Sequence, residues 1–500
     1  MSDSVILFGE PELEFQYGQR VKDPRDGLSL FGAYDVGTAA QPRSISYILL
    51  GTDEGQSKFR AWANQMNQPA LTAPKDNYRL WVPFPGFEAA FHSEFPEDPV
   101  WSGSIDDDKL LEASHQKDEH ERAFQVVNLY LDEFDKTSKL DEKIGVAFCV
   151  VPDDVWQNCR IESHVQNALG YKISGKEKQA RRDGQTSLFE EYNIEQYSLS
   201  PDFRRQLKAR GMKHEIPIQI IRESTLQIND DHSPGERRLT PFSDRKWNLG
   251  TTMYYKCGGK PWRLVSARDG VCYIGIAFRR TSKDEKGKTA CCAAQMFLNT
   301  GDGIVFLGEY GPWYSPKEKQ FHLNEDKAFS LLEGILKTYR ELGGKELTEI
   351  FLHCRSDINA DEFAGYQRAC PAGVKLAGVR VRPDRFGFRL FRNGKMPVMR
   401  GTFLRLNDRI GFLWASGFKP RIATYDGWET PTPLRIEVQH GDAPIERVAQ
   451  DILGLTKLNY NACHLGDGQP VTVGFSDAVG EILISNPTVE YRRPNFKYYI

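Results

Sequence analysis

The sequence predicts an α/β protein of two halves, a Rossmann-like half followed by an RNase H-like half. In the first half, apolar strands alternate with amphipathic helices, an order typical of a doubly wound sheet. In the second half, three strands precede a helix and a fourth strand, which is the order of the RNase H-like fold. We place the predicted domains at residues 1–265 and 266–500.

Four segments indicate the first half. Strands are predicted at Ser44–Leu50, Ile144–Val151 and Ile216–Ile221, and an amphipathic helix at Lys117–Phe134. Continuous apolar strands are typical of parallel sheets buried on both faces. Ligands of such sheets lie beyond the carboxyl ends of the strands. Neither G-x-G-x-x-G nor a Walker sequence occurs, so neither a dinucleotide nor ATP is indicated.

The second half begins with a predicted β-meander. Its strands are Val271–Thr281, Lys288–Asn299 and Gly303–Leu307, joined by turn-rich loops. A helix at Lys327–Leu342 and a strand at Glu349–Cys354 follow.

The C-terminal segment has a pattern of apolar and polar residues that predicts a tail packed into the fold. We predict a helix at Ile445–Tyr460, a short strand at Gln469–Phe475, a helix at Asp477–Leu483 and an apolar end at Phe496–Ile500. An apolar anchor would fix the carboxylate of Ile500 in place. Near Lys and Gln side chains, that carboxylate could hold a metal ion and, through it, a phosphate.

Composition narrows the class of protein. The chain has 500 residues, 40% of them hydrophobic, with a net charge of −3. No apolar run approaches the roughly 20 residues that cross a bilayer, and the N-terminus lacks a secretory pattern. Nine Cys without framework spacing indicate a reducing compartment. We therefore expect a cytoplasmic protein without a membrane partner.

A basic cluster lies within Leu376–Tyr425, where 11 Lys and Arg oppose two Asp. Aromatic residues are interleaved with them, which suits a channel that grips phosphates with one face. The alternative is an Arg-rich sheet paired with acids elsewhere. The basic residues are Arg380, Arg382, Arg385, Arg389, Arg392, Lys395, Arg400, Arg405, Arg409, Lys419 and Arg421.

A helix with strong boundaries is predicted at Ser200–Arg210, with Ser200 as its cap and Gly211 ending it. Arg204 and Lys208 are four residues apart and share one face, beside the buried stripe. Taken alone, such a pair usually lies on a solvent-exposed face of a helix and has no binding role.

Two further positions complete a pattern with this pair, namely Gln219 in a Pro-x-Gln strand and Lys256 before a Gly-Gly turn. With them the chain resembles, over nearly its whole length, the MID and PIWI lobes of prokaryotic Argonautes, in particular the short Argonautes that lack PAZ and N domains. The resemblance also rests on Asp23–Tyr34, Asn248–Trp262, Lys457–Tyr460, Pro470–Val473 and the hydrophobic C-terminus.

The resemblance implies a pocket for the 5′-phosphate of a guide. Its residues would be Arg204, Lys208, Gln219, Lys256 and the carboxylate of Ile500, with magnesium held by Gln219 and Ile500. Arg204 departs from the family, where Tyr or His is commoner.

The resemblance also implies that the nuclease is inactive, so we expect no catalytic residue. Ala277 and Arg355 stand where the family has metal-binding Asp residues, and neither side chain can hold a divalent metal. Asp357 lies two residues beyond Arg355 but cannot build a two-metal site alone. The adjacent pair His353 and Cys354 points to opposite faces of a strand and cannot share catalysis.

The implied function is a catalytically inactive short Argonaute. It would bind a 5′-phosphorylated guide RNA and a complementary single-stranded DNA target. Target recognition would activate a partner with an APAZ domain and a sirtuin-like NADase domain, with a TIR domain as the alternative. This heterodimer, or a larger assembly, would deplete NAD in abortive defence against plasmids and phage. The alternatives are a guide-directed nuclease with carboxylates at unusual positions, and a nucleic-acid-binding regulator without a guide.

Overall fold

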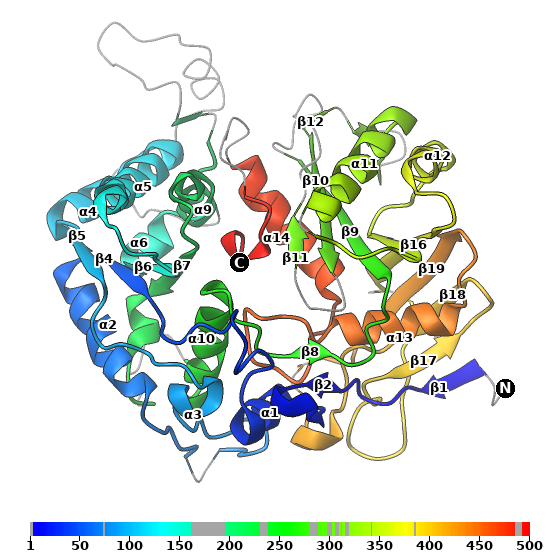
Figure 1. Ribbon diagram of the computed structural model, residues 1–500, viewed down its shortest axis with the longest axis horizontal. Helices are drawn as coiled ribbons and strands as arrows, with labels where there is room; N and C mark the ends of the chain where they lie inside the picture. The colour runs from blue at the N-terminus through cyan, green and yellow to red at the C-terminus, as the bar shows by residue number, and fades with distance from the viewer. Residues whose placement is uncertain are drawn as a thin grey trace, which may run out of the picture.

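The computed structural model has two lobes, with the C-terminal residues between them (Figure 1). It describes the chain except residues 1–3, 74–75, 162–195, 198, 231–238, 281–288, 298–302, 306–309, 312, 316–319, 342, 385–386, 426, 428 and 486–492. In this described part, no helix is both long enough and apolar enough to cross a membrane.

The first lobe is built on a four-stranded parallel sheet of order β5-β4-β6-β7. Alternate residues of β4 pack into separate hydrophobic clusters on the two faces, which explains its continuous apolar sequence. Its strands are β4 (Tyr47–Gly51), β5 (Trp101–Ser104), β6 (Val146–Val151) and β7 (Ile218–Arg222). Its helices are α2 (Asp53–Met66), α3 (Phe87–Phe91), α4 (Asp107–Ser114), α5 (Glu119–Asp135), α6 (Asp153–Asn158), α9 (Phe203–Gly211) and α10 (Phe242–Lys256).

The second lobe is built on a large mixed sheet of order β1-β17-β18-β19-β16-β15-β9-β10-β11. The antiparallel meander of β9, β10 and β11 and the parallel pairing of β15 with β9 confirm the predicted RNase H-like order. The strands are β1 (Val5–Leu7), β9 (Val271–Arg280), β10 (Thr289–Phe297), β11 (Gly303–Val305), β15 (Glu349–Cys354), β16 (Lys375–Pro383), β17 (Thr402–Arg405), β18 (Ile410–Leu413) and β19 (Leu434–His440).

Four helices accompany this sheet: α11 (Glu325–Glu341), α12 (Ala360–Ala369), α13 (Ile445–Leu455) and α14 (Val471–Ile484). Smaller elements are β12 (Tyr310–Gly311), which pairs with β10, and the hairpin β13 (Tyr314–Ser315) and β14 (Gln320–Phe321).

The start of the chain connects the two lobes. Its first strand, β1, completes the sheet of the second lobe, although it precedes the whole first lobe in sequence. A small sheet of β2 (Leu13–Glu14), β3 (Arg20–Val21) and β8 (Arg263–Leu264) follows, with helix α1 (Pro24–Phe31). The predicted domain division at residue 265 stays a prediction. Strand β1 lies before that division in the sequence but belongs to the sheet of the second lobe.

The predicted strand at Gln469–Phe475 is wrong, because Val471–Ile484 forms one helix, α14. A Cβ atom on Gly275 of β9 would lie 1.6 Å from the Thr472 carbonyl oxygen. The helix therefore packs directly on the backbone of β9, and this contact overrides the β-propensity of a short Val-Thr-Val run. The helix predicted at Ile445–Tyr460 ends earlier, at Leu455.

Candidate functional site

Helix α9 presents Arg204 and Lys208 from the first lobe. Phe203 and Leu207 are fully buried, so they form the expected buried stripe. The predicted cap is wrong: Asp202, rather than Ser200, accepts a hydrogen bond from the Arg205 backbone N–H at 3.1 Å. Capping by a carboxylate fixes where α9 begins, and thereby the side to which its cations point.

Lys256 is the last residue of α10, and its ammonium group gathers three oxygen atoms. It donates to the carbonyl oxygen of Ile218 at 2.8 Å, to Gln219 Oε1 at 2.8 Å and to the Ile500 oxygen at 2.7 Å. Lys256 was expected just before a Gly-Gly turn, and the structure confirms this position. It ends helix α10, and the chain turns after it at Gly258, where φ is +100°.

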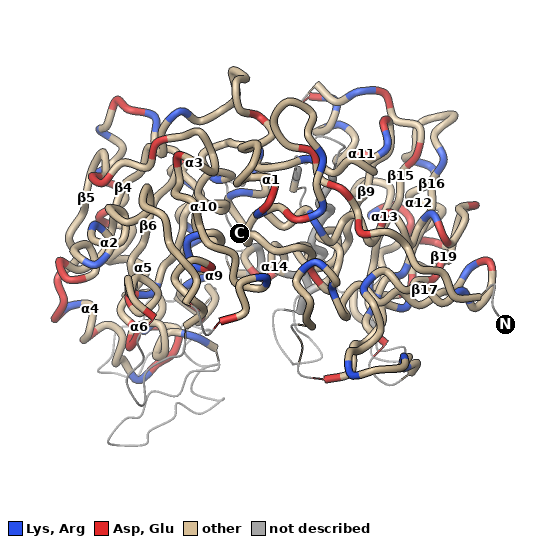
Figure 2. The backbone as a smooth tube through the Cα atoms, turned by 90° about the horizontal axis from the view of Figure 1, so that it is seen from below, with Lys and Arg blue, Asp and Glu red and all other residues tan. Residues whose placement is uncertain are grey.

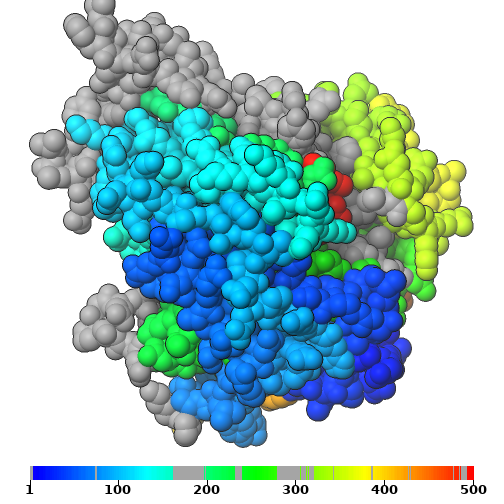
Figure 3. Space-filling view, turned by 60° about the vertical axis from the view of Figure 1, so that its left-hand side comes forward, coloured from blue at the N-terminus to red at the C-terminus, as the bar shows by residue number. Residues whose placement is uncertain are grey.

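The tail reaches this point as a buried segment. Residues Phe496–Tyr498 form the 3₁₀ helix η7, and Tyr499 and Ile500 are buried. They join an apolar cluster with Ala209, Met212, Ala277, Val479 and Ile482, which come from α9, the 3₁₀ turn directly after it, β9 and α14. In Figure 3, residues from near the C-terminal end show as a small red area at the junction of the two lobes.

The site is strongly electropositive and poorly hydrated. Lys208 is 4% exposed and has no hydrogen bond or ion pair with any described residue. Burial and the charges of Lys256 and Arg204 hold the pKa of Lys208 well below its ordinary value. Burial, followed by Arg204, lowers the pKa of Lys256 to about 7. Buried cations without a counter-charge are costly, so this arrangement favours an anion.

Of the five predicted site residues, the structure brings Gln219, Lys256 and Ile500 into direct contact. Lys208 lies close enough to interact electrostatically with Arg204 and Lys256. Burial and the neighbouring Arg160 and Arg205 lower the pKa of Arg204, whereas Asp202 and Glu481 raise it. The Ile218 carbonyl oxygen could not be predicted, because a backbone acceptor leaves no residue signature.

The two predicted magnesium ligands, Gln219 Oε1 and the Ile500 oxygen, both contact the Lys256 ammonium. The described residues include no group of three or more His, Cys, Asp or Glu that could hold a metal. Lys256 thus links the two oxygens that were predicted to hold magnesium, and the magnesium site stays a prediction.

The position of this site departs from the expectation for a doubly wound sheet. Gln219 lies at the amino end of β7, whereas ligands were expected beyond the carboxyl ends. A cavity of about 810 Å³ does lie beyond the carboxyl ends of β6 and β7. Four of its charged lining residues are already paired, with Lys58 2.8 Å from Glu223 and Arg222 bound to Asp153.

The positions implied for nuclease carboxylates contain no free acid. Ala277 belongs to the apolar cluster of the tail, and Arg355 Nη2 donates to Gln469 Oε1 at 2.6 Å. The carboxylate of Asp357 lies 2.5 Å from Arg380 Nη1 and also accepts from two Gln side chains, Gln320 and Gln439, each at 2.7 Å.

His353 and Cys354 point to opposite faces, as predicted. His353 is hydrogen-bonded to Thr472 on α14, whereas Cys354 lies in the cluster that contains α11.

Four of the eleven basic residues at 376–425 are ion-paired, which favours the alternative interpretation for those four. Arg380 pairs with Asp357, Arg400 with Glu10 at 2.9 Å, and Arg421 with Asp26 at 2.5 Å. Arg405 pairs with Glu446 at 2.9 Å. Acidic and basic residues alternate over this lobe (Figure 2). These four Arg therefore match the paired alternative, and the phosphate-binding channel stays a prediction.

The fold is Argonaute-like. No protein-family model matches the chain. It is 24% identical to the argonaute protein of Aquifex aeolicus over 280 residues, which cover 56% of this chain and 35% of that protein.

The solved structures to which this chain is similar include full Argonaute chains. Clostridium butyricum Argonaute, bound to a guide DNA and a 19-mer target DNA, has a TM-score of 0.60 at 16% identity. Drosophila Piwi has a TM-score of 0.60 at 13% identity. These matches cover 97% and 99% of this chain but only 53% and 56% of those chains. The chain therefore spans about half the length of the solved structures.

Proposed function

We propose that this chain is a catalytically inactive short Argonaute that binds the 5′-phosphate of a guide at the Lys208–Lys256 site. The observation that carries the proposal is Lys208, a buried ammonium group without a counter-charge among the described residues, beside a second buried lysine. A phosphate dianion supplies that charge. Charge-assisted hydrogen bonds to such an anion are roughly twice as strong as neutral ones.

Each predicted residue has a distinct role in this proposal. Lys208 and Lys256 bind phosphate oxygens, and Arg204 adds a third positive charge at the mouth of the site. Gln219 and the Ile500 oxygen hold the Lys256 ammonium in position, each within 2.8 Å. Ile500 would contribute as a terminal carboxylate, which offsets part of the lysine charge. Magnesium, if it binds with the guide, would neutralise phosphate charge, but the proposal does not depend on it.

The guide would be RNA and the target complementary single-stranded DNA, with base pairing supplying sequence specificity. The output would come from a second subunit with an APAZ domain fused to a sirtuin-like NADase, or to a TIR domain. Target binding would activate this effector in the cytoplasm, and loss of NAD would abort infection by phage or invasion by plasmids. The absence of free carboxylates at Ala277 and Arg355 supports an output other than cutting.

The proposal is tested by measuring binding of two single-stranded RNAs of one sequence, one with a 5′-phosphate and one with a 5′-hydroxyl. The phosphorylated RNA should bind at least tenfold more tightly, because two charge-assisted contacts are worth about 1.5–3 kcal/mol each. Equal binding would refute the 5′-phosphate site. A matched pair of DNA oligonucleotides decides between RNA and DNA guides.

A further inference from the structure

The outer edge of β1 is an open strand edge at one end of the large sheet. Its inner edge pairs with β17, in the register Val5 to Leu404 and Leu7 to Thr402. Within the described part of the chain, no strand pairs with the other edge. An open edge presents unpaired backbone N–H and C=O groups, which natural proteins normally cover or protect.

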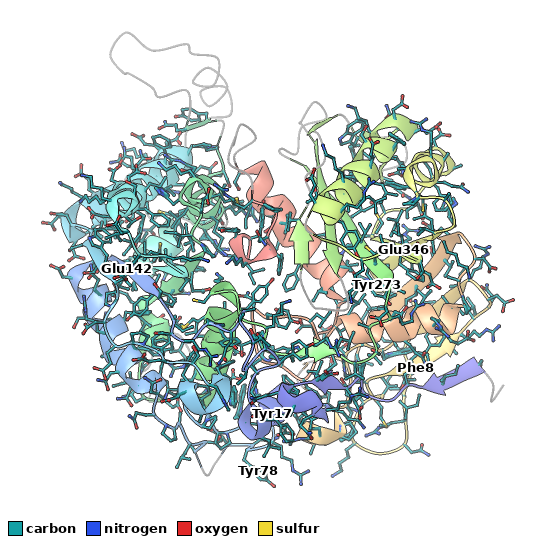
Figure 4. All side chains as sticks on the ribbon, viewed as in Figure 1. Phe8, Tyr17, Tyr78, Glu142, Tyr273 and Glu346 are labelled. Atoms are coloured by element: carbon teal, nitrogen blue, oxygen red, sulfur yellow. The ribbon has the colours of Figure 1, made fainter. Side chains whose placement is uncertain are left out.

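The side chains of this strand make the edge apolar. Ile6 packs against the core, and Phe8 stacks on Phe403 with ring centroids 5.4 Å apart. Figure 4 shows Phe8 next to β17, where β1 ends. Val5 and Leu7 alternate with them and are 46% and 55% exposed. An exposed, apolar edge strand is a site for adding another strand.

The apolar surface continues across the neighbouring strands. Leu404 lies opposite Val5, Phe412 of β18 lies opposite Leu404, and the ring of Phe388 covers Phe412 at 4.5 Å. Phe388 and Phe391 are themselves exposed, as are Met396 and Leu406. Apolar surface gathered in this way is typical of an interface.

The charges around this surface select among the possible occupants. Some basic residues of this region, such as Arg400 and Arg405, are ion-paired and add little net charge to the surface. Arg392, Lys395 and Arg409 are exposed. A second copy of this chain would bring the same positive charge to the contact, whereas an acidic protein would be attracted.

We propose that the β1 edge, with the apolar surface beside it, docks an extended strand of a second, acidic protein. The strand would pair with the backbone of β1 and place alternate apolar side chains over Val5 and Leu7. This inference rests on the proposed function in one respect, since it takes the effector subunit to be that protein. The matched solved chains are about twice as long as this chain. A second polypeptide could supply the parts of those structures that this chain does not match.

The experiment co-expresses the full chain with an APAZ-domain protein of the proposed effector class, which carries the affinity tag. The test variant carries Val5→Glu and Leu7→Glu, and the matched control carries Leu30→Glu, an exposed leucine of α1. We expect the test variant to lose at least tenfold in co-purified chain, while the control co-purifies normally. Both should bind a 5′-phosphorylated guide as the unchanged chain does, which shows that they fold.

A second variant, Arg392→Glu with Lys395→Glu, tests the charge argument without touching the apolar contact. It should weaken co-purification, and the loss should shrink at high salt. Normal co-purification of the Val5/Leu7 variant would overturn the inference and leave the proposed function intact. Failure of the unchanged chain to co-purify would instead refute the effector partnership. Concentration-dependent dimers of the chain alone would favour a second copy as the occupant. Loss of guide–target duplex binding by the Val5/Leu7 variant would favour nucleic acid.

Discussion

The two lobes treat charged residues in opposite ways. In the first lobe, Lys208 and Lys256 are buried together, and Lys208 has no counter-charge in the described part of the chain. In the second lobe, at the implied nuclease position, Asp357 is held by Arg380 and two amides. In the first arrangement Lys208 lacks a counter-charge among the described residues. In the second, the Asp357 carboxylate already has its partners. The contrast separates a site that awaits an anion from one where the charges serve the fold.

The strongest test of this contrast removes both lysines. Lys208→Ala with Lys256→Ala should weaken binding of 5′-phosphorylated RNA by about 3 kcal/mol or more, roughly a hundredfold, and abolish the preference over 5′-hydroxyl RNA. Lys213→Ala is the matched control, since Lys213 lies just beyond α9 and pairs with Asp135 at 2.7 Å. Equal losses for both RNAs would make the two lysines general backbone contacts.

The second test introduces carboxylates at the implied nuclease position of the second lobe and asks whether they create cleavage of nucleic acid. Ala277→Asp with Arg355→Asp should not create cleavage of guide or target with magnesium or manganese, because Asp357 remains bound to Arg380. Ala277 lies in an apolar cluster, so the new carboxylate should lower the free energy of unfolding by about 2–4 kcal/mol. Urea unfolding measures the loss, and Arg355→Asp alone is the control. Guide-dependent cleavage by the unchanged chain that Asp357→Ala abolishes would revive the nuclease reading.

The third test uses pH. The pKa values of Lys208 and Lys256 are lowered in the folded, guide-free protein, that of Lys256 to about 7. Between about pH 7 and 10 the unfolded chain therefore binds more protons than the folded one. Stability should then rise with pH, by up to about 1.4 kcal/mol per unit for one lysine.

The slope of unfolding free energy against pH should flatten in the Lys208→Ala, Lys256→Ala variant. It should also flatten with a 5′-phosphorylated guide, which keeps both lysines charged. An identical slope in all three samples would contradict the burial of these cations.

The smallest expected effect is that of removing magnesium. Because Lys256 already holds Gln219 Oε1 and the Ile500 oxygen, EDTA should change the affinity for a 5′-phosphorylated guide less than threefold. Affinities measured in EDTA and in magnesium at equal ionic strength check this. A loss of tenfold or more in EDTA would restore the predicted metal site and require Lys256 to move.

Much of the fold could be predicted because its signals are local. Continuous apolar runs such as Ile144–Val151 indicate buried parallel strands, and the strand Glu349–Cys354 was predicted to the residue. The failures arose where distant contacts decide. The Val-Thr-Val run of α14 favours a strand by propensity. It is nevertheless helical, and the helix packs closely on Gly275 of β9, which has no side chain to hold it away.

The candidate site divides in the same way. Arg204 and Lys208 could be paired from their spacing on one helix. The contact of Lys256 with Ile500 joins residues 244 positions apart and was predicted only through the family resemblance. The ion pairs that neutralise the basic cluster, such as Arg400 with Glu10, likewise connect the two ends of the chain, and no periodicity reveals them.

The crossing of the chain's ends has a consequence for its synthesis. The sheet of the second lobe includes β1, which is synthesised before the first lobe, and the proposed phosphate site of the first lobe includes Ile500, which is synthesised after the described strands of the second lobe. The first lobe can therefore fold early while its pocket stays unassembled until residue 500 has been translated. If the proposed site holds a guide, a chain that has not yet been translated through residue 500 would present a folded first lobe with an incomplete site, and guide loading would have to wait for that residue.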